Sequence, residues 1–344
     1  MVVWQFCFVV FESKDQAYSY LYEFLSTLKR LQLKNISIHL LHHLENAADC
    51  KIITWYNGAL TIASKQFTPF LGDEVTQFVR SAKQLVPNPT YSGFIVYSHG
   101  NGWFYRHNEK IQAYSTLLKG LKAYKWDLFL LESCYCSTLE IAYEVKDNVH
   151  YLLTSECGRS SFPTFTLESF SICDTCDAKT MAIHLADMYI NRCNMVPPDD
   201  KTILPTVGDI VLLDLTQFNQ YLKWLTQYQI LTRLPIDNYK YAKLKPQKQN
   251  FNRNYDIYTA IIPSLSSQQK QDFTNLHKNL VIYYKQTENL QSKPYSNRFT
   301  GLAWCPVPWD SRHGWTYKYM KCYPLTDVLL YKGTLLSELR EEEI

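Results

Sequence analysis

Short apolar runs alternate with amphipathic segments of helical periodicity through the first two thirds of this 344-residue chain. A strand, a helix and a second strand in succession are typical of a βαβ unit, whose two strands are parallel. We therefore expect an α/β fold, with a mostly parallel sheet that is flanked by helices on both faces. The expected strands are 3–10, 36–41, 52–56, 93–98, 126–131 and 150–154, and the expected helices are 16–31, 73–85, 111–123 and 138–146.

The same alternation continues towards the C-terminus, although it is less regular there. We expect helices at 178–191, 216–228 and 267–285, and strands at 207–213 and 301–307. The stretch 235–254 is polar and basic and is interpreted as a loop. These elements predict a C-terminal extension of the main sheet domain.

Composition excludes several classes of protein. No apolar stretch reaches the roughly 18 residues that a membrane span needs, so no membrane partner is expected. The net charge is +3, from 35 Lys and Arg against 32 Asp and Glu, and this balance does not indicate nucleic acid as a partner. The ten cysteines are scattered and no signal peptide precedes the first expected strand, so we predict free thiols and a cytoplasmic or otherwise intracellular location.

Two of the expected strands end in residues that carry chemistry. The run that ends at Tyr97 is followed by Ser98 and His99, and the run that ends at Leu131 is followed by Glu132, Ser133 and Cys134. The carboxyl ends of parallel strands meet at one edge of a sheet, where ligands bind. The 35 residues that separate His99 from Cys134 correspond to about one βαβ step, so we expect the two side chains to share a crevice.

A cysteine and a histidine in one crevice are the elements of nucleophilic catalysis. A thiolate is the attacking species, and a neighbouring imidazole favours its formation. The backbone N–H groups of Gly100 and Cys134 are candidates to stabilise the oxyanion of a tetrahedral intermediate. Glu132 precedes Cys134 by two positions and is expected to place a carboxylate in the adjoining pocket. Ser155 and Glu156, at the end of the next strand, are further candidates for substrate binding.

These segments resemble the clostripain family of caspase-like cysteine peptidases. The family's histidine block, His-Gly-x-Gly-Trp, is matched by residues 99–103, and its cysteine block by Glu132-Ser133-Cys134 with a following helix that contains Glu140-Ile141-Ala142-Tyr143-Glu144. The next strand of the family ends in Ala-Ser-Glu, which Thr154-Ser155-Glu156 matches. The resemblance is strong over 91–160 and looser elsewhere.

The resemblance implies a caspase-like catalytic domain over residues 1–200, completed by a C-terminal unit over 201–344. It implies hydrolysis of protein or peptide substrates by His99 and Cys134, with cleavage after a basic residue. No cofactor is required by the sequence, and calcium is implied only by the family. One departure concerns specificity: the family has Asp where Glu132 stands, and legumain-type relatives with Glu at this position cut after Asn.

Two other functions remain open at this point. A catalytically inactive caspase-like protein would bind a protein partner through the same fold. A nucleic-acid-binding protein, which we consider the weaker alternative, would use the basic and aromatic segment 239–255 for phosphate contacts and stacking.

Overall fold

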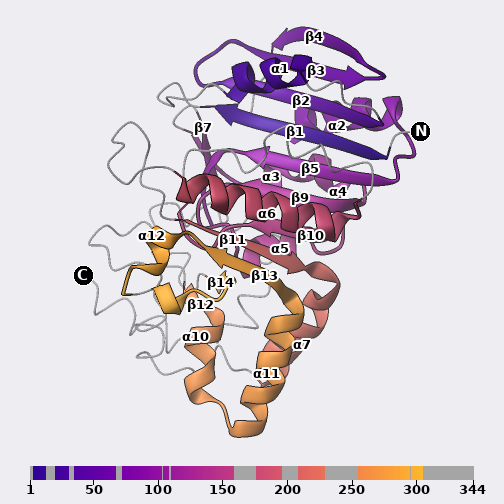
Figure 1. Cartoon of the computed structure of the whole chain (residues 1–344). Helices are drawn as coiled ribbons and strands as arrows, with labels where there is room; N and C mark the ends of the chain where they lie inside the picture. Colours follow the sequence, from indigo (N-terminus) through magenta and orange to yellow (C-terminus); the bar gives the residue numbers. More distant parts are fainter. Residues whose placement is uncertain are drawn as a thin grey trace.

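A large mixed sheet runs through the computed structural model of the chain (Figure 1). The structure describes residues 3–12, 20–30, 35–66, 72–102, 104–107, 110–158, 176–195, 208–228, 255–294 and 296–304. In these residues the sheet has nine strands in the order β13-β11-β10-β9-β5-β1-β2-β3-β4. Their bounds are β1 Trp4–Glu12, β2 Ile36–Leu44, β3 Asp49–Tyr56, β4 Ala59–Gln66, β5 Tyr91–Tyr97, β9 Trp126–Glu132, β10 Val149–Thr154, β11 Asp209–Asp214 and β13 Val281–Gln286.

The middle of the sheet is parallel and its two margins are antiparallel. Strands β2, β1, β5, β9 and β10 pair in parallel, in that order. Strands β3 and β4 form an antiparallel margin on one side, and β11 and β13 form one on the other. The prediction of a mostly parallel sheet is confirmed.

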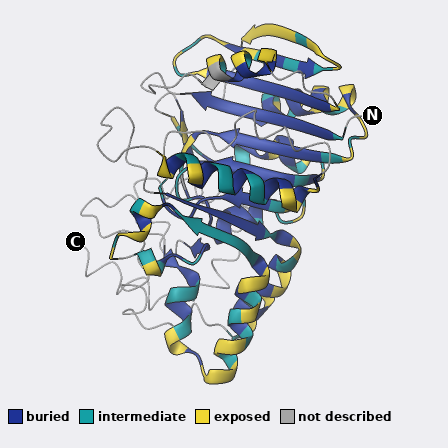
Figure 2. Ribbon diagram, viewed as in Figure 1, coloured by how far each residue is buried: buried dark blue, intermediate teal, exposed yellow. Residues whose placement is uncertain are grey.

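Helices cover both faces of this sheet, as predicted. Figure 1 shows α1 and α6 on the face towards the viewer and the helices α2 to α5 behind the strands. The helix bounds are α1 Tyr20–Arg30, α2 Gly72–Leu85, α3 Tyr114–Leu117, α4 Lys119–Lys122, α5 Leu139–Val145 and α6 Ala178–Asn194. Because both faces are covered, nearly all residues of β1, β2, β5 and β9 are buried (Figure 2).

Strand β1 shows how the sequence builds two cores at once. Successive side chains of a strand point to opposite faces. Phe6 and Phe8 accordingly belong to the cluster under α1 and α6, whereas Cys7 and Val9 belong to the cluster under α2 to α5. Each fully buried side chain of this size contributes about 1.5–3 kcal/mol of transfer free energy, so these strands hold the layers together.

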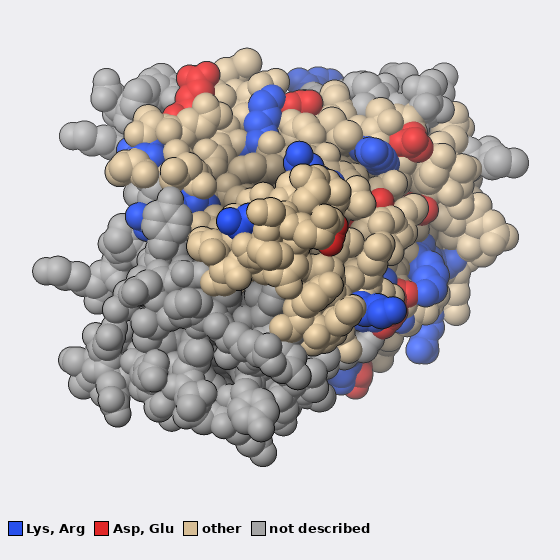
Figure 3. Space-filling model, turned by 90° about the horizontal axis from the view of Figure 1, so that it is seen from below, with Lys and Arg blue, Asp and Glu red and all other residues tan. Residues whose placement is uncertain are grey.

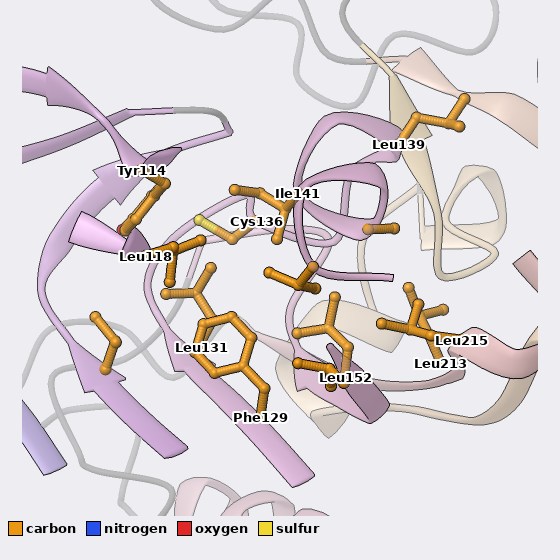
Figure 4. Packing of buried hydrophobic residues seen from close by; sticks show 14 of the residues in the cluster. Tyr114, Leu118, Phe129, Leu131, Cys136, Leu139, Ile141, Leu152, Leu213 and Leu215 are labelled. Atoms are coloured by element: carbon orange, nitrogen blue, oxygen red, sulfur yellow. The ribbon is translucent and has the colours of Figure 1, made fainter. Parts of the chain in front are cut away.

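The hydrophobic cluster behind the sheet packs against the segments that lead into the candidate site. Figure 4 shows Phe129 and Leu131 of β9 packed with Leu152 of β10 and Ile141 of α5. These side chains fix the C-terminal ends of β9 and β10 against the start of α5.

The C-terminal part of the chain extends the same sheet and the same core. The sheet gains β11 and β13, and Phe218, Tyr221 and Phe273 join the cluster that contains Phe129. The predicted boundary at 200/201 lies outside the described residues, so the division into two units stays a prediction. The remaining elements are α7 Phe218–Tyr228, α10 Ile257–Ile261, α11 Ser267–Leu280, α12 Glu288–Gln291, β12 Tyr255–Asp256, β14 Ala303–Trp304 and the 3-10 helices Leu215–Gln217, Ile262–Ser264 and Ser296–Arg298.

Two expected helices are shorter than the sequence indicated. The helix expected over 267–285 ends at Leu280, and residues 281–286 form β13, whose Val, Ile and Tyr residues favour a strand. The helix expected over 111–123 begins only at Tyr114, because residues 110–113 form β8 of a small sheet. That sheet consists of β6 His99–Asn101, β7 Phe104–His107 and β8 Lys110–Ala113.

No helix in the described part of the chain is long and apolar enough to cross a membrane. On the face that Figure 3 shows, basic and acidic side chains are interspersed among neutral residues, and no described region of that face carries one sign of charge alone. Most of the basic segment 239–255 lies outside the described residues, so its suggested role in binding nucleic acid stays untested.

Candidate active site

The register of the parallel strands brings the two candidate catalytic residues to one edge. Strands β5 and β9 are neighbours, and Tyr97 is paired with Glu132 at the last position of each. His99 and Cys134 each lie two residues beyond this pair. The backbone N–H of Ser98 also donates to the carbonyl of Glu132 at 3.2 Å, so the segments that follow β5 and β9 stay side by side just beyond the sheet.

Cys134 lies at a sharp turn. The next residue, Tyr135, has a φ of 58°, which is rare for a bulky side chain, and its N–H donates to the carbonyl of Cys157 at 3.0 Å. The turn leaves Cys134 half-buried, whereas Cys136 is fully buried. Helix α5 begins only at Leu139 and is capped by the Thr138 side chain, so Cys134 does not lie at its N-terminus.

His99 opens the small sheet and is exposed at its surface. It is paired with Arg106 of β7. The surrounding protein lowers the pKa of His99 below its ordinary value of 6.5 by desolvation, and the charge of Arg106 acts in the same direction. Glu45, just beyond the end of β2, opposes this shift. The imidazole is therefore mainly neutral at pH 7, the form that can accept a proton from a thiol.

A pair of histidines that the sequence did not single out supports the small sheet from β2. His43 Nδ1 lies 2.7 Å from His107 Nε2, and His107 stacks on Phe11 at a centroid distance of 5.0 Å. Burial lowers the pKa of both histidines, to about 4 for His107. Two neutral rings can share one hydrogen bond, so this contact joins β7 to the sheet near neutral pH.

Gly100 follows His99 in β6 and is opposite Tyr105. A methyl group at Gly100 would lie 2.2 Å from the Tyr114 hydroxyl oxygen and 2.3 Å from Ser133 Oγ. The histidine segment therefore packs directly against the residue that precedes Cys134. The role of the Gly100 and Cys134 N–H groups as an oxyanion hole stays a prediction.

Glu132 is the last residue of β9 and is buried, with 3% of its surface exposed. Its strand partner is Tyr97, which packs with Leu130 in the cluster under α6. The carboxylate thus belongs to the same end of the sheet as Cys134, and its predicted contact with a substrate side chain stays a prediction.

Ser155 and Glu156 lie behind the turn at Cys134 and are fully buried. Ser155 Oγ is 3.2 Å from the carbonyl oxygens of both Ser133 and Cys157. Glu156 Oε2 accepts a hydrogen bond of 2.7 Å from the N–H of Gly301. These contacts lie within the protein and give both residues a structural role. The predicted contact of Ser155 and Glu156 with substrate stays a prediction.

Glu156 also has acidic neighbours. Burial, Asp256 and Asp209 together raise its pKa well above the ordinary value of 4.5. Asp256 accepts hydrogen bonds from Thr259 N, Thr300 N and Thr300 Oγ1. The raised pKa means that Glu156 retains its proton near neutral pH.

We expect Glu156→Gln to remove part of the dependence of stability on pH. Above pH 4.5 the unfolded chain loses the proton while the folded state keeps it, so stability falls with rising pH up to the folded pKa, by at most about 1.4 kcal/mol for each pH unit. Glutamine mimics the protonated acid, and its advantage in Tm over the wild type should grow from pH 5 to pH 8. The exposed Glu288→Gln is the control, and an equal pH dependence in all three proteins would contradict the assignment.

The described residues contain no group of three or more His, Cys, Asp or Glu side chains arranged to hold a metal ion. Calcium, which the family resemblance implied, therefore has no identified ligands among them. The seven described cysteines are all thiols rather than disulfides, as predicted.

Comparison with known proteins identifies the fold of this chain. No family model matches the sequence, and no curated protein matches it. The structure is similar to that of iotapain, a secreted C11 cysteine protease from Bacteroides thetaiotaomicron, with a TM-score of 0.70 and 15% identity over 95% of this chain and 99% of that one. It is also similar to an inactive zymogen C11 protease from Parabacteroides distasonis, with a TM-score of 0.67 and 16% identity over 93% and 97% of the two chains. This chain thus has the caspase-like fold of the C11, clostripain-type cysteine proteases, as its motifs indicated.

The same comparison corrects the predicted location. Iotapain is described as secreted, which points away from the cytoplasmic or intracellular location predicted from the scattered cysteines and the lack of a recognisable signal peptide. Free thiols do not by themselves indicate a reducing compartment, because a buried thiol is protected from oxidation. All described cysteines except Cys134 are buried.

Proposed function

We propose that this chain is a cysteine endopeptidase of clostripain type that cleaves after a basic residue. One observation carries the proposal: the paired ends of β5 and β9 bring His99 and Cys134 to the same edge of a sheet with the C11 protease fold. The substrates are proteins or peptides. An irreversible peptide inhibitor is bound in one similar structure, a secreted C11 protease with 14% identity and a TM-score of 0.66, over 94% of this chain and 99% of that one.

The reaction follows from the chemistry of the two side chains. The Cys134 thiol gives its proton to His99, and the thiolate attacks the scissile carbonyl. The tetrahedral intermediate places its negative oxygen on the N–H groups of Gly100 and Cys134. His99 then protonates the leaving amine, the peptide bond breaks, and an acyl-enzyme remains. Water, deprotonated by His99, releases the acid and restores the thiol.

Glu132 provides specificity in this proposal. A buried carboxylate beside the attacked carbonyl favours a cationic guest, since a hydrogen bond to a charged group contributes about 1.5–3 kcal/mol. An Asn side chain gains less because it is neutral, and an Asp side chain is repelled. We therefore expect cleavage after Arg or Lys.

A panel of thiol-reactive peptide probes tests this proposal. The probes share one sequence and carry Arg, Lys, Asn or Asp at the cut position. We expect Cys134 to react fastest with the Arg and Lys probes and slowest with the Asp probe. Preference for Asn or Asp would reject the basic specificity and leave the catalytic pair in place. Failure of every probe, and of protein substrates, in a folded protein would favour a catalytically inactive binding protein.

We expect Glu132→Gln to lower kcat/KM for an Arg substrate by about one to two powers of ten, as the loss of a charge-assisted hydrogen bond implies. Labelling of Cys134 by a small uncharged reagent should be unaffected. The control is Asp272→Asn, which removes one charge from α11 and should leave kcat/KM unchanged. Equal values for Glu132→Gln and wild type would exclude Glu132 from the pocket.

A further inference from the structure

A buried tyrosine hydroxyl lies between the two segments that carry the catalytic pair. Tyr114 is the first residue of α3 and is fully buried, with none of its surface accessible to solvent. Its hydroxyl lies 2.9 Å from Oγ of Ser98, the residue before His99. Burial raises the pKa of Tyr114 well above its ordinary value, so the phenol keeps the proton that it needs as a donor.

The same hydroxyl faces the cysteine segment. The point at which a Gly100 methyl group would stand is 2.2 Å from the Tyr114 oxygen and 2.3 Å from Ser133 Oγ, so both oxygens lie beneath Gly100. Ser133, the residue before Cys134, is itself buried. We call Ser98, Tyr114 and Ser133 the hydroxyl cluster.

Two hydrogen bonds to backbone carbonyl groups flank the hydroxyl cluster. On one side, the N–H of Ser98 donates to the carbonyl of Glu132. On the other, the Cys136 thiol lies 3.5 Å from the carbonyl of Gly102. Figure 4 shows Tyr114 and Cys136 in one layer of packed side chains with Leu118 and Leu131. The cluster thus lies in the middle of the contact between the two segments.

We propose that Tyr114 is a positioning residue for the reaction. Its hydroxyl holds Ser98 by a hydrogen bond and lies beneath Gly100 beside Ser133 Oγ, so it fixes His99 and Gly100 relative to Cys134, and it makes no contact with substrate. The proposal rests on the function proposed above for His99 and Cys134. Displacement of a catalytic group by about 1 Å can cost about a hundredfold in rate, so loss of this hydroxyl should act on chemistry and spare substrate binding.

The test compares Tyr114→Phe with Tyr221→Phe. Both changes remove one hydroxyl from a fully buried tyrosine, and that of Tyr221 makes its hydrogen bond of 3.3 Å with His277 in the C-terminal part of the chain. We expect Tyr114→Phe to lower kcat by about ten- to a hundredfold with KM nearly unchanged. Tyr221→Phe should keep the wild-type kcat even if its Tm falls by a similar amount.

A second readout is the pH dependence of alkylation of Cys134 by iodoacetamide. In the wild type, His99 should keep the thiol reactive well below the ordinary cysteine pKa of about 8.5. In Tyr114→Phe the profile should move towards that value. Ser98→Ala removes the same hydrogen bond from its other partner, so it serves if Tyr114→Phe does not fold, and it should show the same shift.

The outcomes separate this proposal from the proposed function. A wild-type kcat and alkylation profile in Tyr114→Phe, or in Ser98→Ala where the first does not fold, would overturn the positioning role. An equal loss of kcat in Tyr221→Phe would also overturn it, because the effect would then be one of stability. If the wild type cleaves nothing, the shifted alkylation profile of Cys134 would still support Tyr114, and only the proposed function would fail.

Discussion

Cys134→Ala is expected to lower kcat/KM for an Arg substrate by at least about 10⁴-fold while the protein stays folded. The thiol sulfur forms the covalent bond to the substrate in the proposed reaction, and alanine offers no atom in its place. Because Cys134 is half-buried at a turn, loss of the sulfur removes little packing, and the Tm should change by only a few degrees.

The matched control is Cys193→Ala, which removes a buried thiol from α6. It should cost more stability than Cys134→Ala and leave kcat/KM unchanged. The two variants therefore separate loss of the nucleophile from loss of packing. Turnover by Cys134→Ala at the wild-type rate would show that the nucleophile lies elsewhere.

The sequence was sufficient to predict the parallel centre of the sheet and the position of His99 and Cys134 beyond the ends of neighbouring strands. Strands buried on both faces are mostly apolar, and in β1, β5 and β9 polar residues stand only within two positions of a strand end. One βαβ step between His99 and Cys134 was enough to predict neighbouring strands, which the pairing of Tyr97 with Glu132 confirms.

The margins of the sheet could not be predicted in the same way. Strand β4 is mostly exposed, so its sequence carries no apolar pattern, and only its pairing with β3 defines it as a strand. Strand β13 follows α11 without a break, and its pairing with β11 decides where the helix ends. Both strands depend on contacts between segments that are distant in the sequence, and local sequence patterns do not reveal such contacts.

The residues that support the site could not be predicted from the sequence for a similar reason. Tyr114 lies 15 residues after His99 in a stretch that has the pattern of an ordinary buried helix. Only the fold brings its hydroxyl to Ser98. Likewise, Glu156 matched a motif position that suggested substrate binding, whereas its burial against Asp256 and the Gly301 N–H gives it a structural role.

Gly100→Ala is expected to reduce kcat/KM by more than about a hundredfold, because the added methyl group has no room. It would lie 2.2 Å from the Tyr114 oxygen, 2.3 Å from Ser133 Oγ and 2.9 Å from the carbonyl oxygen of Phe104. The first two atoms belong to side chains, but the third is backbone of β7, so the histidine segment itself must move. Such overpacking also costs about 1–3 kcal/mol of stability.

Gly58→Ala is the control for this loss of stability. Gly58 lies in the turn between β3 and β4, where a methyl group would meet nothing within 4 Å, but its φ of 76° makes any side chain unfavourable. This variant should lose a comparable amount of stability and keep its activity. Wild-type kcat/KM in Gly100→Ala would mean that the histidine segment tolerates displacement, and would contradict the packing of Gly100 against the residues that precede and support Cys134.

A second comparison shows which atoms oppose the methyl group. In a Tyr114→Phe background the nearest of the three atoms is absent, so Gly100→Ala should cost less stability there than in the wild type. Residues in contact commonly couple by about 0.5–3 kcal/mol, which urea unfolding of the four proteins in this cycle can measure. The value of kcat/KM should not recover to the same extent, because the Phe104 carbonyl still displaces the segment that contains His99. Equal stability costs in the two backgrounds would show that the Tyr114 hydroxyl does not lie beneath Gly100.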